Sequence, residues 1–203
     1  MRSLLLATTN RHKLEEFRAI FADLPFHLLS LGDLKLDMDV EETGMTFAEN
    51  ARLKALAYAQ AAGMLTLAED SGLEIDALGG APGVYSARFL GPDVSYEERF
   101  RYILEQLQGI PVEQRTARFR CVIVLAEPSG YYRSVAGVVE GVIADAPRGE
   151  YGFGYDPIVL IPELGKTMAE LMPEEKNRIS HRGRAARLAR MLLEEWPPSS
   201  SSS

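Results

Sequence analysis

Two long runs rich in β-branched residues, separated by a turn sequence, most constrain how this chain can fold. The runs cover residues 117–126 and 132–143, and Glu127-Pro128-Ser129-Gly130 lies between them. β-Branched residues favour extended backbone, and Pro, Ser and Gly favour a reversal of the chain. The second half of the chain is therefore predicted to contain a long antiparallel hairpin.

The first half of the chain has a different pattern, in which short apolar runs alternate with segments of helical spacing. Apolar runs at residues 4–7, 26–31 and 65–68 predict strands, whereas residues 14–24 and 46–62 carry apolar side chains every three or four residues. Strands that alternate with helices and then give way to a hairpin predict an α/β fold with a mixed central sheet flanked by helices. We expect two lobes with an active-site cleft between them.

Capping patterns and apolar stripes predict the ends and faces of several helices. Thr46 with Glu49, and Thr167 with Glu170, have the Thr-x-x-Glu spacing of a capping box. A helix is expected over residues 95–108, and the chain closes with an amphipathic helix near residues 183–195. The apolar stripe of this last helix is predicted to contain Ala185, Leu188, Leu192 and Trp196.

The chain is predicted to form one domain followed by a short tail. It has 203 residues, of which 46% are apolar and 25% are charged, an ordinary composition for a globular domain. We see no repeat or linker that would divide it, so a single domain is predicted over residues 1–196. Residues 197–203 are Pro and Ser only, and they are expected to form a disordered tail.

Charge and cysteine content limit the partners of the protein and its compartment. The formal net charge of -7 disfavours nucleic-acid binding but allows a small anion held by a few local cations. Cys121 is the only cysteine, so no internal disulfide can form, and its apolar neighbours predict a buried thiol in a strand. The apolar stretch at residues 4–7 is too short for a signal peptide or a membrane span. We expect a cytoplasmic protein without membrane contact.

Acidic residues in two segments indicate a site for a divalent cation. In LAEDSGLEIDALG, Glu69 and Asp70 end an apolar run directly before Ser71-Gly72, so a buried strand is predicted to deliver a carboxylate to the edge of a cleft. Glu41-Glu42 offers further oxygen ligands, of the kind that Mg²⁺ takes while phosphates and water complete its coordination. A carboxylate near such an ion can also deprotonate water. An acidic pair on a loop is, however, most often only solvated.

A polar segment follows the first predicted strand and opens the first helix. Thr8, Asn10 and Lys13 would bring hydroxyl, amide and ammonium groups together with backbone N–H groups at the start of this helix, where anions bind. In the alternative interpretation Asn10 is an N-cap and Lys13 is solvated. The chain has no Gly-rich phosphate loop followed by Lys-Ser or Lys-Thr.

Aromatic and basic residues near the C-terminus indicate a place for a planar base. In Phe153-Gly154-Tyr155-Asp156 a base can stack on a ring while the glycine lets the backbone approach its edge. Core aromatics in a turn are the alternative. Lys176, His181 and Arg182 precede the final helix, either as donors to a keto oxygen and phosphates or as capping and surface groups.

Five segments together resemble the inosine/xanthosine triphosphate pyrophosphatase family, which removes non-standard purine nucleotides. They are TTNRHK, EETGMTFAENARLKA, LAEDSGLEIDALGGAPGVYSARF, GFGYDP and EKNRISHRGRA, and they occur in order between residues 4 and 190. The resemblance implies a two-lobed α/β fold, a homodimer, a Mg²⁺ requirement, and hydrolysis of ITP, dITP and XTP to the monophosphate and pyrophosphate.

The resemblance also implies roles for individual residues. Glu41 and Asp70 would bind the metal, and Asp70 would also be the base that activates water. The triphosphate and the purine would be held by Thr8, Thr9, Asn10, Arg11, His12, Lys13, Lys54, Ser71, Arg88, Phe153, Gly154, Tyr155, Asp156, Lys176, His181 and Arg182. Two other functions stay open: a catalytically silent nucleotide sensor, and a phosphatase or pyrophosphatase for a different metabolite, such as a modified pyrimidine nucleotide.

Overall fold

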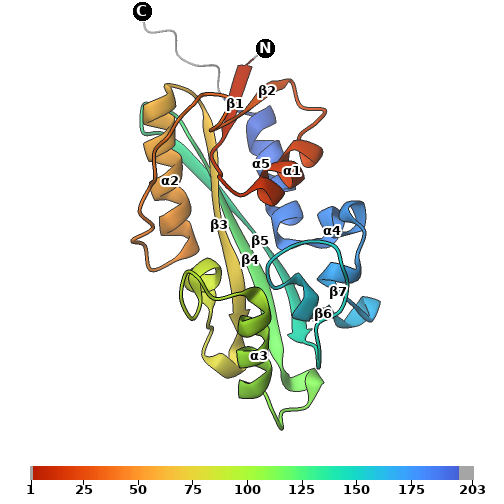
Figure 1. Ribbon diagram of the computed structural model, residues 1–203. Helices are drawn as coiled ribbons and strands as arrows, with labels where there is room; N and C mark the ends of the chain where they lie inside the picture. Colours follow the sequence, from red (N-terminus) through yellow and green to blue (C-terminus); the bar gives the residue numbers. More distant parts are fainter. Residues whose placement is uncertain (1, 197–203) are drawn as a thin grey trace, which may run out of the picture.

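A computed structural model describes residues 2–196, and the predicted tail at residues 197–203 lies outside them (Figure 1). The strands are β1 (Arg2–Leu6), β2 (Phe26–Ser30), β3 (Thr66–Ile75), β4 (Thr116–Ala126), β5 (Tyr132–Ile143), β6 (Val159–Ile161) and β7 (Lys166–Thr167). The α-helices are α1 (Arg11–Ile20), α2 (Phe47–Ala62), α3 (Tyr96–Gln106), α4 (Pro173–Ile179) and α5 (His181–Glu194). Short 3-10 helices include η2 (Gly83–Arg88), η4 (Asp156–Ile158) and η6 (Met168–Glu170).

The strands form one seven-stranded mixed sheet in the order β2-β1-β3-β4-β5-β6-β7. β1 pairs in parallel with β2 and β3, and every later pairing in this order is antiparallel. β4 and β5 pair from Thr116 opposite Val142 to Ala126 opposite Tyr132, which confirms the predicted long hairpin. The predicted α/β class with a mixed sheet flanked by helices is also confirmed.

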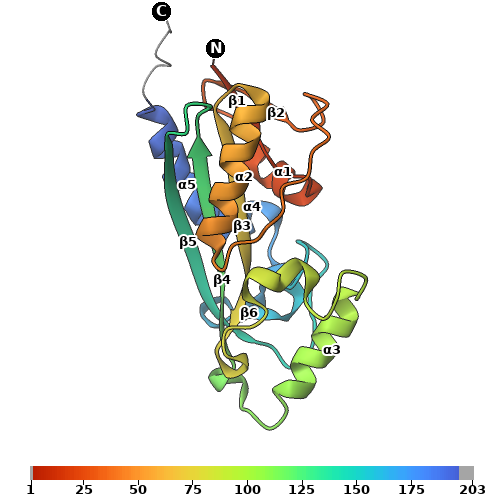
Figure 2. The same cartoon turned by 90° about the vertical axis from the view of Figure 1, so that its left-hand side faces the viewer.

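Helices cover both faces of the sheet and divide the molecule into two lobes (Figures 1 and 2). Ala51, Ala55 and Ala59 of α2 are fully buried, and these small side chains let α2 lie close to one face. α1 and α5 cover the opposite face, where the aromatic rings of Phe17 and Phe21 pack with the alanines of α5. α3 and the β6 region pack against the carboxyl-terminal half of β3 and the start of β4. The buried apolar side chains between these elements form a second cluster, which is the core of the lower lobe in Figure 1.

The free edge of β3 creates the cleft. β1 pairs with β3 only at Leu5 opposite Thr66 and Leu6 opposite Leu67, although β3 runs on to Ile75. From residue 68 onward, one edge of β3 has no neighbouring strand among residues 2–196. The carboxyl end of β1 therefore opens into a crevice, which is where α/β sheets commonly bind ligands.

The prediction that a strand ends at Glu69 and Asp70 is wrong. β3 continues through Ser71 and Gly72, and each residue from Thr66 to Ile75 has a partner in β4. The Ser-Gly sequence indicated a turn, but ten consecutive pairings with β4 outweigh the weak strand propensity of those two residues. The acidic pair therefore lies in the middle of a strand.

One prediction about the C-terminal region also needs correction. Leu188, predicted on the apolar stripe of the last helix, is 43% exposed, whereas Ala185, Ala189 and Leu193 form the buried face at four-residue spacing. The second predicted capping box is confirmed, and it caps the single turn η6. Within residues 2–196, no helix is long and apolar enough to cross a bilayer.

Candidate active site

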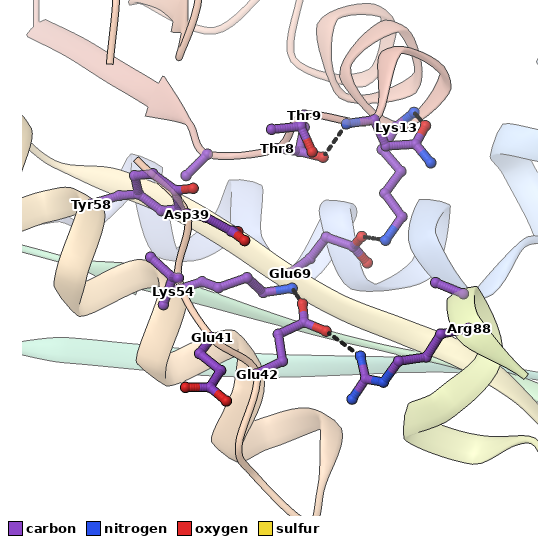
Figure 3. A pocket seen from close by; sticks show the side chains of 14 residues that line it. Thr8, Thr9, Lys13, Asp39, Glu41, Glu42, Lys54, Tyr58, Glu69 and Arg88 are labelled. Atoms are coloured by element: carbon purple, nitrogen blue, oxygen red, sulfur yellow. Dashed lines mark hydrogen bonds and ion pairs between the residues drawn. The ribbon is translucent and has the colours of Figure 1, made fainter. Parts of the chain in front are cut away.

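A cavity of about 590 Å³ lies at the carboxyl end of β1 (Figure 3). Five segments contribute to it: the loop that leads into α1, the segment before α2, the middle of α2, β3, and the end of η2. Its polar lining residues are Thr8, Thr9, Asn10, Lys13, Asp39, Glu41, Glu42, Lys54, Tyr58, Glu69 and Arg88. The structure thus brings together residues that lie up to 80 positions apart in the sequence.

The loop after β1 is shaped by its own polar side chains. Asn10 is the N-cap of α1, and its Oδ1 accepts a hydrogen bond from the Lys13 N–H at 3.2 Å. The Thr8 hydroxyl accepts one from the Asn10 N–H at 3.1 Å. The capping interpretation is therefore right for Asn10, but Lys13 is not simply solvated, because its ammonium pairs with Glu69. Arg11 points elsewhere, since its exposed guanidinium pairs with Glu15.

Glu69 and Asp70 point to opposite faces of β3, as neighbours on a strand must. Glu69 faces α1 and α5, where it pairs with Lys13 and lies 3.7 Å from Arg182, and Cys121 Sγ donates to it at 3.1 Å. Burial alone would raise the pKa of Glu69, but Lys13 and Arg182 outweigh burial and hold that pKa far below its usual range. Glu69 is thus a buried, ionised anchor for cations from two helices.

Asp70 faces α2 and meets a fully buried amide. Asn50 Nδ2 donates to Asp70 Oδ2 at 3.1 Å, and Asn50 Oδ1 accepts from the Gly44 N–H at 2.8 Å, which fixes the direction of the amide. Lys54 Nζ lies 3.7 Å from Asp70 Oδ1. Burial raises the pKa of Asp70, although the charge of Lys54 opposes this shift. A carboxylate with a raised pKa is better suited to accept a proton.

The neighbours Glu41 and Glu42 occupy different environments. Glu42 is half-buried and accepts hydrogen bonds from both Lys54 and Arg88. Glu41 is exposed at the rim of the cavity, and its side chain points away from Arg88 (Figure 3). The role of Glu41 as a metal ligand stays a prediction. Sequence reasoning offered Glu42 only as a further oxygen ligand and did not predict its pairing with Lys54 and Arg88.

A second, smaller cavity of about 100 Å³ adjoins the first and shares Asn10 and Lys13 with it. Eight of the predicted substrate-binding residues line it: Ser71, Phe153, Gly154, Tyr155, Asp156, Lys176, His181 and Arg182. Phe153 forms one wall, while His12 stacks on its ring with centroids 5.1 Å apart and lines a separate pocket. Tyr155 is a core aromatic as well as a lining residue, since it is 4% exposed and donates to the Ser86 carbonyl.

Buried ion pairs hold in place the two cations that line this second cavity, Lys176 and Arg182. Lys176 pairs with Glu16 at 2.8 Å and with Asp156 at 2.7 Å. Arg182 pairs with Glu16 at 2.7 Å and donates to the Ser71 hydroxyl at 3.0 Å. Burial raises the pKa of Asp156, whereas for Glu16 the two cations outweigh burial and lower the pKa. Glu16, which sequence reasoning missed, thus fixes both cations.

His181 presents an unpaired ring nitrogen beside the second cavity. Its side chain is 4% exposed and stacks on Phe119 with centroids 4.8 Å apart. Burial and the nearby Arg182 lower the pKa of His181 well below its usual value, so the ring is neutral at pH 7. Within residues 2–196, its Nδ1 has no hydrogen-bond partner. Because buried polar atoms are nearly always paired, this nitrogen indicates a place for a polar ligand atom.

Two glycines let backbone segments approach the sheet where the site needs them. A Cβ on Gly137 of β5 would lie 2.2 Å from the carbonyl oxygen of His181, so only glycine admits the start of α5 at this distance. A Cβ on Gly72 would lie 2.5 Å from the carbonyl oxygen of Gly83 and would displace η2, which carries Arg88. These contacts bring α5 and η2 against the strands of the cleft.

Relatives of this chain cover almost its whole length. The family model described as the Ham1 family matches residues 4–191. The dITP/XTP pyrophosphatase of Geobacillus kaustophilus is 50% identical over 196 residues, which are 97% of this chain and 95% of that protein. The dITP/XTP pyrophosphatase of Bacillus subtilis is 47% identical over 194 residues, or 96% of this chain and 98% of that protein.

Solved structures agree with this relationship. A HAM1 protein from Coxiella burnetii superposes with a TM-score of 0.88 at 43% identity, covering 96% of this chain and 100% of that one. The Ham1 protein of Staphylococcus aureus gives a TM-score of 0.86 at 43% identity, with 97% and 100% covered. On both sequence and structure, this chain belongs to the Ham1 family.

Proposed function

We propose that this protein is a Mg²⁺-dependent pyrophosphatase that hydrolyses ITP, dITP and XTP to the monophosphate and pyrophosphate. The observation that carries the proposal is the meeting of two unlike cavities at Asn10 and Lys13. One cavity contains cations and carboxylates suited to a metal-bound triphosphate, and the other contains an aromatic wall and polar groups suited to a purine. The names of the relatives, dITP/XTP pyrophosphatase, support the same substrates.

The donor set of the cleft fits magnesium. Mg²⁺ takes oxygen ligands and is usually bound by one or two carboxylates, with phosphates and water completing its octahedron. Within residues 2–196, no three acidic, His or Cys side chains converge to form a metal site by themselves. We therefore assign Glu41 and Asp70 as ligands of an ion that substrate oxygens help to hold. Bound magnesium would offset the charge of the phosphates.

Asp70, which does not line the cavity itself but lies 3.7 Å from the lining residue Lys54, would act with the cations of the cleft to hydrolyse the bond between the α- and β-phosphates. Asp70 would take a proton from a water molecule while the oxygen of that water bonds to the α-phosphorus. The bond from that phosphorus to the bridging oxygen breaks, and pyrophosphate leaves with the electron pair. Lys13, Lys54 and Arg88 would stabilise the charge that develops on this leaving group.

The second cavity would reject adenine by the group at position 6, whereas guanine, which shares the keto oxygen, must be rejected at its 2-amino group. Inosine and xanthosine have a keto oxygen at position 6, whereas adenosine has an amino group. Phe153 would stack on the ring, and buried donors near His181 would meet the keto oxygen. A donor left unpaired by adenine costs about 1 to 3 kcal/mol, which gives roughly 10- to 100-fold rejection per contact.

One assay separates this function from the alternatives. Pyrophosphate and orthophosphate release are measured with ITP, dITP, XTP, dATP and dUTP, each with and without Mg²⁺. We expect pyrophosphate release from the first three substrates only, and only with the metal. Orthophosphate as the only product would reject attack at the α-phosphorus. Nucleotide binding without turnover would identify a sensor, and preference for dUTP would identify a pyrimidine enzyme.

We also propose that the protein is a cytoplasmic homodimer, with the family relationship as support for both properties. An exposed apolar surface is consistent with a subunit contact: Met45 is 81% exposed and Tyr85 is 54% exposed, and both line a further cavity of about 660 Å³, separate from the two described above. Light scattering after size exclusion is expected to give twice the mass of one chain, and the mass of a single chain would contradict the dimer.

A further inference from the structure

The cations of the cleft already have carboxylate partners (Figure 3). Lys13 pairs with Glu69, and Lys54 pairs with Glu42. Arg88 Nη1 lies 3.5 Å from Glu42 Oε2. Any phosphate that binds Lys54 and Arg88 must therefore compete with a carboxylate of the protein itself.

Glu42 is placed between two cations from different parts of the fold. Lys54 comes from the middle of α2, and Arg88 ends η2, which belongs to the opposite wall of the cavity. One oxygen of the carboxylate accepts from Lys54 and the other from Arg88. A phosphate group that bridges the two walls would use the same two donors.

The overall charge of the cavity makes this competition important. Three cations line it, Lys13, Lys54 and Arg88, against the four carboxylates of Asp39, Glu41, Glu42 and Glu69. The lining is thus formally negative before any ligand enters, and a triphosphate brings about four further negative charges. A charge inside the cavity interacts more strongly with a bound phosphate than a charge at the rim does, because solvent screens the charge at the rim.

We propose that Glu42 is an internal competitor for the polyphosphate, which holds Lys54 and Arg88 in place in the empty cleft and yields them to the phosphates. It is a positioning residue that sets affinity, and Glu41 beside it has no such role because its side chain points away from these cations. The inference rests on the proposed function only in taking a polyphosphate as the ligand.

The test compares Glu42→Gln with Glu163→Gln, the same isosteric change at an exposed position away from the cavity, in the full-length protein. Binding of inorganic tripolyphosphate is measured by titration calorimetry in EDTA, so that no metal contributes. Glu42→Gln is expected to bind roughly 3- to 10-fold more tightly than the wild type, the range expected from releasing a partly exposed ion pair. Glu163→Gln is expected to bind within about twofold of the wild type, because its exposed charge is screened.

Two further readouts distinguish competition from a general change in charge. The KM for ITP is expected to fall in Glu42→Gln with a much smaller change in kcat, since the competitor acts before the chemical step. Glu42→Gln is expected to raise tripolyphosphate affinity less in a protein that already carries Arg88→Gln than in the wild type. In that background Glu42 has no Arg88 guanidinium to withhold from the phosphates.

Each other outcome overturns the proposal in a recognisable way. Unchanged or weaker tripolyphosphate binding by Glu42→Gln, with normal binding by the wild type, would overturn this inference alone. A higher KM for ITP would show that Glu42 holds the substrate or its metal instead. Absence of tripolyphosphate binding by all the proteins would also overturn this inference, whereas the proposed function is tested separately by pyrophosphate release from ITP with Mg²⁺.

Discussion

Replacement of Asp70 by Asn is expected to lower kcat for dITP by about 10²- to 10⁴-fold, the range typical for loss of a general base. Asn has the same shape but does not take up the proton of the attacking water. Nucleotide affinity is expected to persist, because Lys13, Lys54 and Arg88 remain in the cleft. The loss should therefore appear in kcat rather than in KM.

The same substitution is not expected to destabilise the fold. Burial raises the pKa of Asp70 above its ordinary value of 3.8, so folding favours the protonated form of this group. A carboxyl whose pKa is higher in the folded state destabilises that state at pH values above the unfolded pKa. At pH 7 the neutral amide removes this penalty, while Lys54 keeps Glu42 as its partner. The Tm is expected to stay the same or rise.

Kinetics and thermal unfolding of Asp70→Asn are compared with those of Asp93→Asn, which makes the same chemical change at an exposed position. The control is expected to match the wild type in both measurements. Full activity of Asp70→Asn with dITP would rule out its role as the base. A Tm far below that of the control would show that Asp70 holds the fold together and that lost activity reflects unfolding.

Local sequence patterns predicted most elements of the fold because those elements depend on local chemistry. The hairpin of β4 and β5 follows from β-branched runs and their turn, and α2 follows from a capping box that the structure contains in full. The Ser71-Gly72 sequence misled the prediction of β3, because ten pairings with β4 extend that strand. Local residue propensities do not determine the pairing of two strands that lie so far apart in the sequence.

The candidate site was predicted as residue types but not as a geometry. Sequence reasoning treated Glu69 and Asp70 as one pair, whereas the strand sends them to opposite faces with different partners. Glu16 was missed although it follows Lys13 by three residues on α1, because its partner Arg182 lies 166 positions away. Contacts of this kind arise from tertiary packing, so the pattern around one segment does not reveal them.

Replacement of Glu69 by Gln is expected to destabilise the protein by about 3 to 5 kcal/mol, the typical result of removing one partner from a buried ion pair. Gln has nearly the same shape, so the change removes charge rather than volume. Lys13 then loses its carboxylate partner, and Arg182, which is 2% exposed, keeps only Glu16. Arg182, buried away from water, would then share this one remaining carboxylate with Lys176.

The pH dependence of this effect has a definite sign. The pKa of Glu69 is lowered in the folded state, so the ionised group contributes stability above its unfolded pKa, near 4.5, and this contribution disappears as the pH falls through the folded value. The difference in unfolding free energy between the wild type and Glu69→Gln is therefore expected to be largest near pH 7. It should narrow steadily below about pH 4.5.

Urea unfolding at several pH values measures this difference, with the fluorescence of the single tryptophan, the buried Trp196, as the signal. The matched control is Glu140→Gln, in which the same change breaks an exposed pair with Arg118. Exposed pairs contribute up to about 1 kcal/mol, so the control should cost little at any pH. If Glu69→Gln were no more destabilising than Glu140→Gln, or if its effect did not change with pH, Glu69 would not be the ionised anchor that joins α1 and α5 to the sheet.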